Sequence, residues 1–283
     1  MRLMRVGEPG LERPAVEIDG GVFDVSADVS EYDRAFWEGD GLDRLAGLVE
    51  SGDLPPVADG VRVGAPIPTP SKVVCVGLNY RDHAREAGAD IPTEPIIFFK
   101  APNTVVGPQD DVLIPPGSEK TDWEVELAVV IGARCRYLRD EADAAGRIAG
   151  YAISNDVSER AYQMERGGQW VKGKSCETFN PLGPVLVTAD DVADPQALAM
   201  RLAVNGVERQ ASSTAEMIFG VHHLVWYLSQ FMVLEPGDLV NTGTPAGVGL
   251  GFDPPVYLRA GDVMELSIDG LGSQRQVCRD AQV

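Results

Sequence analysis

Short apolar runs separated by glycine, proline and asparagine dominate the chain from residue 71 onward. KVVCVGL, PIIFFK, WEVELAVVIG, GYAISND, GPVLVT, LAMRLAVNG, DLVNTG and VMELSIDG each have the length and β-branched content of a strand. Helical periodicity is rarer, and we predict helices over Asp140–Ile148 and Thr214–Phe231. The pattern therefore predicts a β-rich α+β fold, a mixed β-roll or partial barrel.

The first 70 residues have a different pattern. The elements predicted there are two strands joined by a turn and one helix, at Ala15–Ile18, Gly21–Val25 and Arg34–Glu50. Five prolines follow in Leu54–Pro70, which cannot continue a helix or a central strand. We therefore predict a small N-terminal α+β domain over residues 1–70 and a larger domain over residues 71–283.

Composition and charge exclude several partners. The formal net charge of -19 argues against a nucleic-acid partner, and any site for a small acid must supply its own local positive charge. The four cysteines have no CxxC spacing and are expected to be reduced thiols; they are Cys75, Cys135, Cys176 and Cys278. The N-terminus lacks a signal-peptide pattern and no apolar run is long enough to span a bilayer, so we expect a cytoplasmic protein with no membrane partner.

Two carboxylates alternate within the most apolar predicted strand. Glu124 and Glu126 are two residues apart in WEVELAVVIG, so they share one face of the strand. An exposed edge strand would place both in water, but the apolar neighbours favour burial, where two carboxylates are costly without a cation. Asp156 ends the run GYAISND and is a third candidate. An all-oxygen set favours Mg²⁺ or Mn²⁺ over zinc.

A histidine and a glutamate lie three residues apart in a predicted short helix. Asn79 is the expected N-cap and Gly88 the expected end, which places His83 and Glu86 on one helical face. A carboxylate beside an imidazole suits a general base, although such pairs on surface helices are usually idle. The other histidines, His222 and His223, lie in a predicted helix and are expected to be packing or surface residues.

Two further segments carry candidate chemistry. In WVKGKSCETF, a lysine among small residues could stabilise an enolate or hold a substrate carboxylate; the alternative is that Lys172 and Lys174 are ordinary solvated charges. The segment TGTPAGVG could present backbone N–H groups and hydroxyls to an anion. It is not a dinucleotide loop, because Pro254 and Pro255 follow it and no helix is predicted after the glycines.

Six motifs together resemble the fumarylacetoacetate hydrolase family from about Ser71 to Gly272. They are VGLNYRDHAREAG, KTDWEVELAVVIG, NDVSER, GKSCETFNPLGP, MIFGVHHLVWYLSQFMVLEPGD and TGTPAGVG, and they occur in the family's order. The leading 70 residues resemble the N-terminal part of bacterial members that act on sugar-derived or aromatic-derived diketo acids, such as 2,4-diketo-3-deoxy-fuconate hydrolases.

The resemblance implies a role for each candidate residue. It implies Mg²⁺ or Mn²⁺ (with Ca²⁺ able to replace them in crystals), a β-rich mixed roll and a homodimer. The implied metal ligands are Glu124, Glu126 and Asp156; the implied catalytic residues are His83, Glu86 and Lys174; the implied substrate-binding residues are Arg81, Gln163 and Thr244.

The expected reaction is hydrolysis of a carbon–carbon bond in a small 2,4-dioxo acid, an acylpyruvate, through a metal-stabilised pyruvate enolate. Hydration of a 2-oxo-4-enoate, decarboxylation of an oxaloacetate-like acid and keto–enol isomerisation are alternatives at the same kind of site. A non-catalytic metal- or ligand-binding protein is the alternative from another class. The sequence leaves open the natural substrate and the choice between Mg²⁺ and Mn²⁺.

Overall fold

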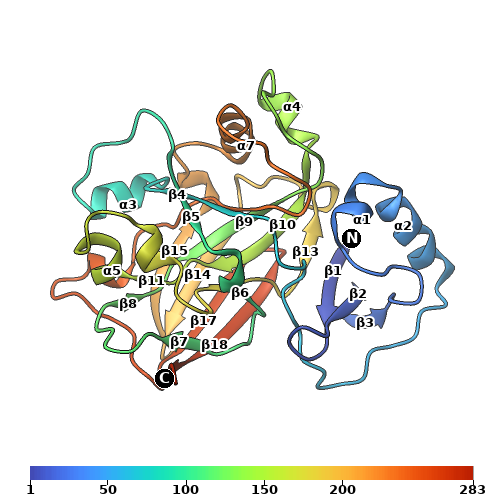
Figure 1. Cartoon of the computed structure of the whole chain (residues 1–283), viewed down its shortest axis with the longest axis horizontal. Helices are drawn as coiled ribbons and strands as arrows, with labels where there is room; N and C mark the ends of the chain where they lie inside the picture. The colour runs from blue at the N-terminus through green and yellow to red at the C-terminus, as the bar shows by residue number, and fades with distance from the viewer. Residues whose placement is uncertain (283) are drawn as a thin grey trace.

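A nine-stranded sheet forms the centre of the computed structural model, which describes residues 1–282 (Figure 1). In spatial order its strands are β3 (Gly21–Asp24), β2 (Arg13–Ile18), β1 (Arg2–Val6), β13 (Leu186–Thr188), β10 (Ile148–Asn155), β9 (Val125–Ile131), β16 (Leu239–Asn241), β4 (Val73–Gly77) and β5 (Ile96–Lys100). Only β16 and β4 run parallel to each other; the other neighbouring strands are antiparallel. Every residue of β9 is buried, as the sequence predicted.

A second sheet packs against one face of β9. Its strands are β15 (Val207–Ser213), β14 (Ala199–Val204), β17 (Val263–Ile268), β18 (Gly272–Asp280) and β7 (Val112–Ile114). Val125, Leu127 and Val129 of β9 share a buried cluster with Met200 and Met264 of this sheet. Burying each such side chain contributes roughly 1.5–3 kcal/mol. The β-rich roll is confirmed, and none of the sheets in the described residues closes into a barrel.

The opposite face of β9 belongs to a different core. Ala128 and Val130 cluster with Val73 of β4 and Leu3 of β1. These alternate positions share the side of the strand on which Glu126 lies, since side chains alternate along a strand. One face of β9 is therefore fully apolar, while the other begins with a carboxylate and continues with small aliphatic residues.

The N-terminal segment extends the large sheet and carries two helices, α1 (Arg34–Glu38) and α2 (Gly41–Ser51). The single helix predicted over Arg34–Glu50 is wrong, because Gly39 is extended and breaks it. β1 pairs with β13, so the first 70 residues are hydrogen-bonded to the rest of the chain (Figure 1). The domain boundary at residue 70 stays a prediction.

The remaining helices are short. They are α3 (Arg81–Glu86), α4 (Glu141–Ala145), α5 (Arg160–Met164), α6 (Val171–Lys174) and α7 (Val221–Ser229). The helix predicted over Thr214–Phe231 is shorter, because the backbone angles of Met217 and Gly220 are not helical and leave only a 3₁₀ turn, η3 (Thr214–Glu216), before α7. The helix predicted over Asp140–Ile148 is also shorter, since Ile148 begins β10.

Two-residue strands and 3₁₀ turns complete the secondary structure. They are β6 (Val105–Val106), β8 (Thr121–Asp122), β11 (Ser158–Glu159), β12 (Asn180–Pro181), η1 (Pro102–Thr104), η2 (Ala189–Asp191) and η4 (Gly249–Gly251). Within residues 1–282, no helix has both the length and the apolar character needed to cross a membrane.

The four cysteines are free; Cys75, Cys135 and Cys278 are buried, and Cys176 is partly buried. Burial raises the pKa of Cys135 and Cys176 to about 11 and that of Cys278 to about 12, and it raises the pKa of Cys75 well above the usual value. A raised pKa means less thiolate at about pH 8, and thiolate is the reactive form. We therefore expect Ellman's reagent to react slowly with the folded protein and to titrate all four thiols rapidly in guanidinium chloride. Fast reaction of the folded protein would contradict this burial.

Candidate active site

Three buried carboxylates meet where β9 and β10 lie side by side. Glu124 immediately precedes β9, Glu126 is its second residue, and Asp156 immediately follows β10. The Asp156 N–H donates to the Glu124 carbonyl at 2.9 Å, which fixes the two residues together. One oxygen from each of the three carboxylates lies within 4.8 Å of the others. The alternation along the chain at β9 brings Glu124 and Glu126 together, and the pairing of β10 with β9 adds Asp156 to the group.

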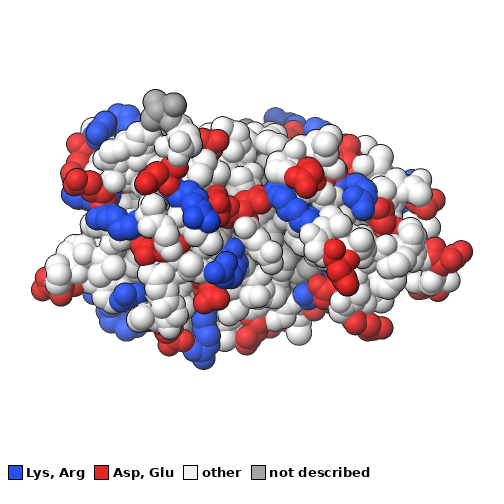
Figure 2. Space-filling model, turned by 90° about the horizontal axis from the view of Figure 1, so that it is seen from below, with Lys and Arg blue, Asp and Glu red and all other residues white. Residues whose placement is uncertain are grey.

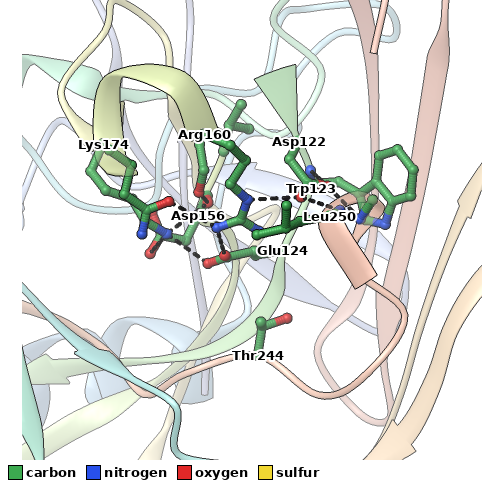
Figure 3. A network of polar contacts seen from close by, with 12 residues as sticks. Asp122, Trp123, Glu124, Asp156, Arg160, Lys174, Thr244 and Leu250 are labelled. Atoms are coloured by element: carbon green, nitrogen blue, oxygen red, sulfur yellow. Dashed lines mark hydrogen bonds and ion pairs between the residues drawn. The ribbon is translucent and has the colours of Figure 1, made fainter. Parts of the chain in front are cut away.

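Two buried lysines neutralise part of this group. Lys174 Nζ donates to Glu124 Oε2 at 2.7 Å and to Asp156 Oδ2 at 2.9 Å (Figure 3). Lys100 is also fully buried, and its ammonium pairs with Asp156 and donates to the Val157 carbonyl at 3.0 Å. Lys174 therefore lies beside two of the predicted metal ligands, and its catalytic role stays a prediction. Lys172, in contrast, is exposed and donates to a backbone carbonyl.

Glu126 is left without a cationic partner among residues 1–282. Its Oε2 accepts from the Gly243 N–H at 2.8 Å, and burial followed by the charges of Asp156 and Glu124 raises its pKa well above the usual value. Glu124 differs, because Lys174 and Arg160 outweigh burial and lower its pKa to about 2. A hard divalent cation with oxygen ligands fits this donor set, since it would compensate the one carboxylate that no side chain balances.

A second ion pair holds Glu124 from the other side. Arg160 Nη1 lies 2.8 Å from Glu124 Oε1, and Arg160 Nε donates to Asp122 Oδ2 at 2.8 Å (Figure 3). Asp122 also accepts three backbone N–H groups, from Trp123 at 2.8 Å, Gly249 at 2.6 Å and Leu250 at 2.9 Å. Asp122 thus connects the η4 turn to the arginine that positions a predicted metal ligand.

Replacing Asp122 by asparagine is expected to lower the free energy of unfolding by about 3–5 kcal/mol, because Arg160 would keep its buried charge with one carboxylate fewer. Urea denaturation measures this loss. The matched control is Asp143→Asn, which removes a carboxylate from the exposed pair with Arg139 and is expected to change stability little. Equal losses in both variants would contradict a structural role for Asp122.

The predicted His83–Glu86 pair is present in α3. His83 Nδ1 lies 3.0 Å from Glu86 Oε2, and Glu86 Oε1 accepts the Gly247 N–H at 2.8 Å. Gly251 packs so closely on Glu86 that an added Cβ would lie 2.5 Å from the glutamate's Cδ atom. The glutamate is therefore fixed by the loop that follows β16, and it in turn orients the imidazole.

Asn79 does not cap α3, so that prediction is wrong. The N-cap is Tyr80, without a side-chain bond, while the Asn79 amide donates to the carbonyls of Thr242 and Phe219 at 2.8 and 3.0 Å. Asn79 Oδ1 also accepts from the Phe219 N–H at 2.9 Å. The side chain satisfies backbone groups of two distant segments instead of its own helix, which places the start of α3 beside β16.

Side chains of the candidate site line one cavity of about 280 Å³. His83, Glu124, Glu126, Lys174, Gln163 and Thr244 all contribute to its wall. Arg81 is not among the lining residues; its guanidinium donates to the carbonyls of Glu216 and Met217. The structure therefore gathers all but one of the predicted catalytic and substrate-binding residues at or beside the cavity, and a substrate role for Arg81 stays a prediction.

The glycine-rich segment after β16 serves the protein's own carboxylates. The N–H groups of Gly243, Gly247 and Gly249 donate to Glu126, Glu86 and Asp122. The Thr244 hydroxyl donates to the Val125 carbonyl at 2.9 Å and accepts from Gln210. The expectation that these N–H groups receive a ligand anion is therefore corrected: they orient acidic side chains around the cavity.

Sequence reasoning missed four residues of this site. They are Lys100, Asp122, Arg160 and Trp170, of which Arg160 and Trp170 line the cavity. A weak signal existed for Lys100, a charge at the end of the apolar run PIIFFK, and for Arg160, which ends NDVSER next to the predicted ligand Asp156. Nothing in the local sequence marked Asp122 or Trp170.

Comparisons with known proteins find relatives along the whole chain. The family described as Fumarylacetoacetate (FAA) hydrolase C-terminal matches residues 72–279. A relative from Burkholderia multivorans, provisionally named a hydrolase, is 49% identical over 284 residues and covers 100% of both chains.

Two solved structures resemble the whole chain. A maleylpyruvate hydrolase from Sphingobium sp. SYK-6, in complex with manganese(II) and pyruvate, is 30% identical with a TM-score of 0.81 and covers 100% of both chains. A 2-hydroxyhepta-2,4-diene-1,7-dioate isomerase from Mycobacterium marinum is 34% identical with a TM-score of 0.76 and covers 100% of both chains. The sequence match over most of the chain and these full-length likenesses show that the chain belongs to the fumarylacetoacetate hydrolase family.

Proposed function

We propose that the protein is a Mg²⁺- or Mn²⁺-dependent hydrolase that cleaves a carbon–carbon bond in a small 2,4-dioxo acid, an acylpyruvate. The observation that carries the proposal is that His83 faces the same cavity as Glu124 and Glu126 while Glu86 holds its Nδ1 atom. A base and a cation site in one cavity suit attack by water on an acid whose carbonyls are polarised.

The metal would be held by Glu124, Glu126 and Asp156. When bound, a divalent cation supplies Lewis-acid charge for the carboxylate and 2-oxo group of such an acid. The charge of the cation would also offset the long-range repulsion between an anionic substrate and a protein of net charge -19.

His83 is the proposed general base. Its Nε2 atom would take a proton from water while Nδ1–H donates to Glu86, whose negative charge stabilises the imidazolium. The hydroxide adds to the C4 carbonyl, the C3–C4 bond breaks, and its electron pair remains on C3. The proton on His83 then returns to C3, which gives pyruvate and a carboxylic acid. Lys174 is buried among the acid groups and lines the cavity, so its ammonium would stabilise the negative charge of the departing enolate.

The direct test is loss of the ultraviolet absorbance of an acylpyruvate with purified protein and Mg²⁺ or Mn²⁺, coupled to detection of pyruvate. We expect metal-dependent loss of absorbance with one pyruvate formed per substrate consumed. Metal binding without turnover across a panel of 2-oxo acids would favour a non-catalytic binding protein instead.

Isomerisation is the second candidate, because the Mycobacterium marinum neighbour is named as an isomerase. His83 would then move a proton between carbon atoms without using water. Proton NMR of the product separates the two reactions, since hydrolysis yields two acids whereas isomerisation keeps one carbon skeleton.

Two other expectations remain proposals. A homodimer is testable by light scattering of the purified protein, and the domain division at residue 70 by limited proteolysis. Because β1 pairs with β13, cleavage near residue 70 is expected to leave the two fragments associated.

A further inference from the structure

The cavity has two chemically different ends. The acid groups, Lys174, Arg160 and His83 surround one end. Apart from the polar side chains of Gln163 and Thr244, the rest of the wall is apolar, and it comes mainly from the end of β4, the start of β5, the segment before α6 and the η4 turn. Its main apolar residues are Val76, Leu78, Ile96, Phe98, Trp170 and Leu250.

An aromatic corner joins the two ends. The rings of Phe98 and Trp170 meet edge to face with centroids 5.4 Å apart, and Lys174 Nζ lies 5.0 Å from the Phe98 centroid. Gly77 makes room for this corner, because an added Cβ there would lie 2.6 Å from the Trp170 ring. An acid bound beside Lys174 would therefore extend its remaining atoms along aromatic and aliphatic surface.

The apolar end offers no cation to a second carboxylate. Among the described residues that line the cavity, the permanently charged cations are Arg160 and Lys174, and both already pair with carboxylates at the acid end. A carboxylate moved from water against this apolar wall would lose hydration without gaining a partner.

The formal charges of the buried side chains also disfavour a second carboxylate on the substrate. The buried ion-pair network at the acid end holds four carboxylates, of Asp122, Glu124, Glu126 and Asp156, against three cationic side chains, of Lys100, Arg160 and Lys174; the Glu86 carboxylate is outside this network and pairs with His83. The balance is one negative charge. One divalent cation and one substrate carboxylate bring it to zero, whereas a second carboxylate would leave an uncompensated negative charge in the cavity.

We propose that the acyl group of the substrate is uncharged and apolar, aliphatic or aromatic, and that the protein discriminates against dicarboxylic substrates. This inference rests on the proposed function. It separates the chain from its two neighbours, since maleylpyruvate and a 1,7-dioate each carry a second carboxylate. It also disfavours a sugar-derived tail, whose hydroxyls would meet few polar partners at the apolar end.

A matched pair of substrates tests the proposal. 4-Methylpentanoylpyruvate and succinylpyruvate have the same number of non-hydrogen atoms and differ in an isopropyl group against a carboxylate. We expect kcat/KM to favour the isopropyl compound by about 10²-fold or more. Equal or better turnover of succinylpyruvate would overturn the inference and leave the hydrolase assignment standing.

If neither compound is hydrolysed, that result counts against the proposed function alone. A binding measurement then tests the inference. Calorimetry with Mn²⁺ present would compare 6-methyl-2-oxoheptanoate with 2-oxoadipate, a pair with the same difference at the tail and no bond to cleave. Tighter binding of the apolar acid supports the proposal, and equal or tighter binding of 2-oxoadipate overturns it.

A variant that introduces a positive charge tests where the acyl group of the substrate binds. Ile96 is 38% exposed at the start of β5, so an arginine there can reach the cavity mouth while its charged end stays hydrated. Ile96→Arg is expected to shift the kcat/KM ratio and the binding ratio toward the dicarboxylic acids by roughly 10-fold. The matched control is Val207→Arg, at an exposed position of β15 outside the cavity, which is expected to leave both ratios unchanged. An unchanged ratio in Ile96→Arg would place the tail elsewhere and overturn the proposal.

Discussion

Replacing His83 by alanine is expected to lower kcat for an acylpyruvate by roughly 10²–10⁴-fold, because the variant loses its general base. Mn²⁺ affinity is expected to change little, since the predicted ligands Glu124, Glu126 and Asp156 remain in place. Steady-state kinetics at saturating metal measures the first effect and calorimetry the second. Unchanged kcat would remove His83 from the chemistry.

The chain provides a matched control for this variant. His223 Nδ1 also lies 3.0 Å from a glutamate oxygen, that of Glu141, and His223 is half-buried like His83. Its ring stacks on Phe219 and contacts Trp226 on α7, outside the cavity. His223→Ala is therefore expected to keep kcat near the unmodified value. Equal losses in the two variants would indicate a general cost of removing a paired imidazole instead of a catalytic role.

The strand pattern of the sequence predicts much of the fold and the centre of the site. A strand with period-two alternation places Glu124 and Glu126 on one side whatever packs around it, because the constraint is local. The same holds for His83 and Glu86, which need only one turn of helix to meet. Both pairs are found as predicted, because each depends on residues that are close in sequence.

The groups that surround these pairs could not be predicted in the same way. Asp122 and Arg160 meet because β8 pairs with β11, and Lys100 reaches Asp156 from the end of β5. Each contact joins segments tens of residues apart, so no local period reveals it. Whether a buried charge such as Lys100 is tolerated depends on the partners that the complete fold brings to it.

Errors in the predicted helices have a related cause. Apolar spacing continues from Thr214 through the start of α7, but the backbone angles of Met217 and Gly220 are not helical. There, Asn79 accepts the Phe219 N–H and Gln196 accepts the Val221 N–H, so these backbone groups are satisfied by distant side chains. Tertiary hydrogen bonds therefore override helical periodicity in this segment.

Replacing Glu126 by glutamine is expected to have opposite effects on metal binding and on the stability of the metal-free protein. Mn²⁺ affinity should fall by at least about 10²-fold, and hydrolase activity with it, because one of three carboxylate ligands loses its charge. The metal-free protein should become about 1–3 kcal/mol more stable, because a buried carboxylate without a cationic partner is replaced by a neutral amide. Calorimetry with Mn²⁺ and urea denaturation in the presence of a chelator measure the two effects.

Glu124→Gln is the control that separates ligand loss from charge relief. Glu124 is paired with both Lys174 and Arg160, so its neutralisation removes a compensating charge from two buried cations. This variant should also lose Mn²⁺ affinity, but its metal-free form should be less stable than the unmodified protein. We assign Glu126 as the one carboxylate of the group whose charge only a metal ion would compensate. Stability changes of the same sign in the metal-free forms of Glu126→Gln and Glu124→Gln would contradict this assignment.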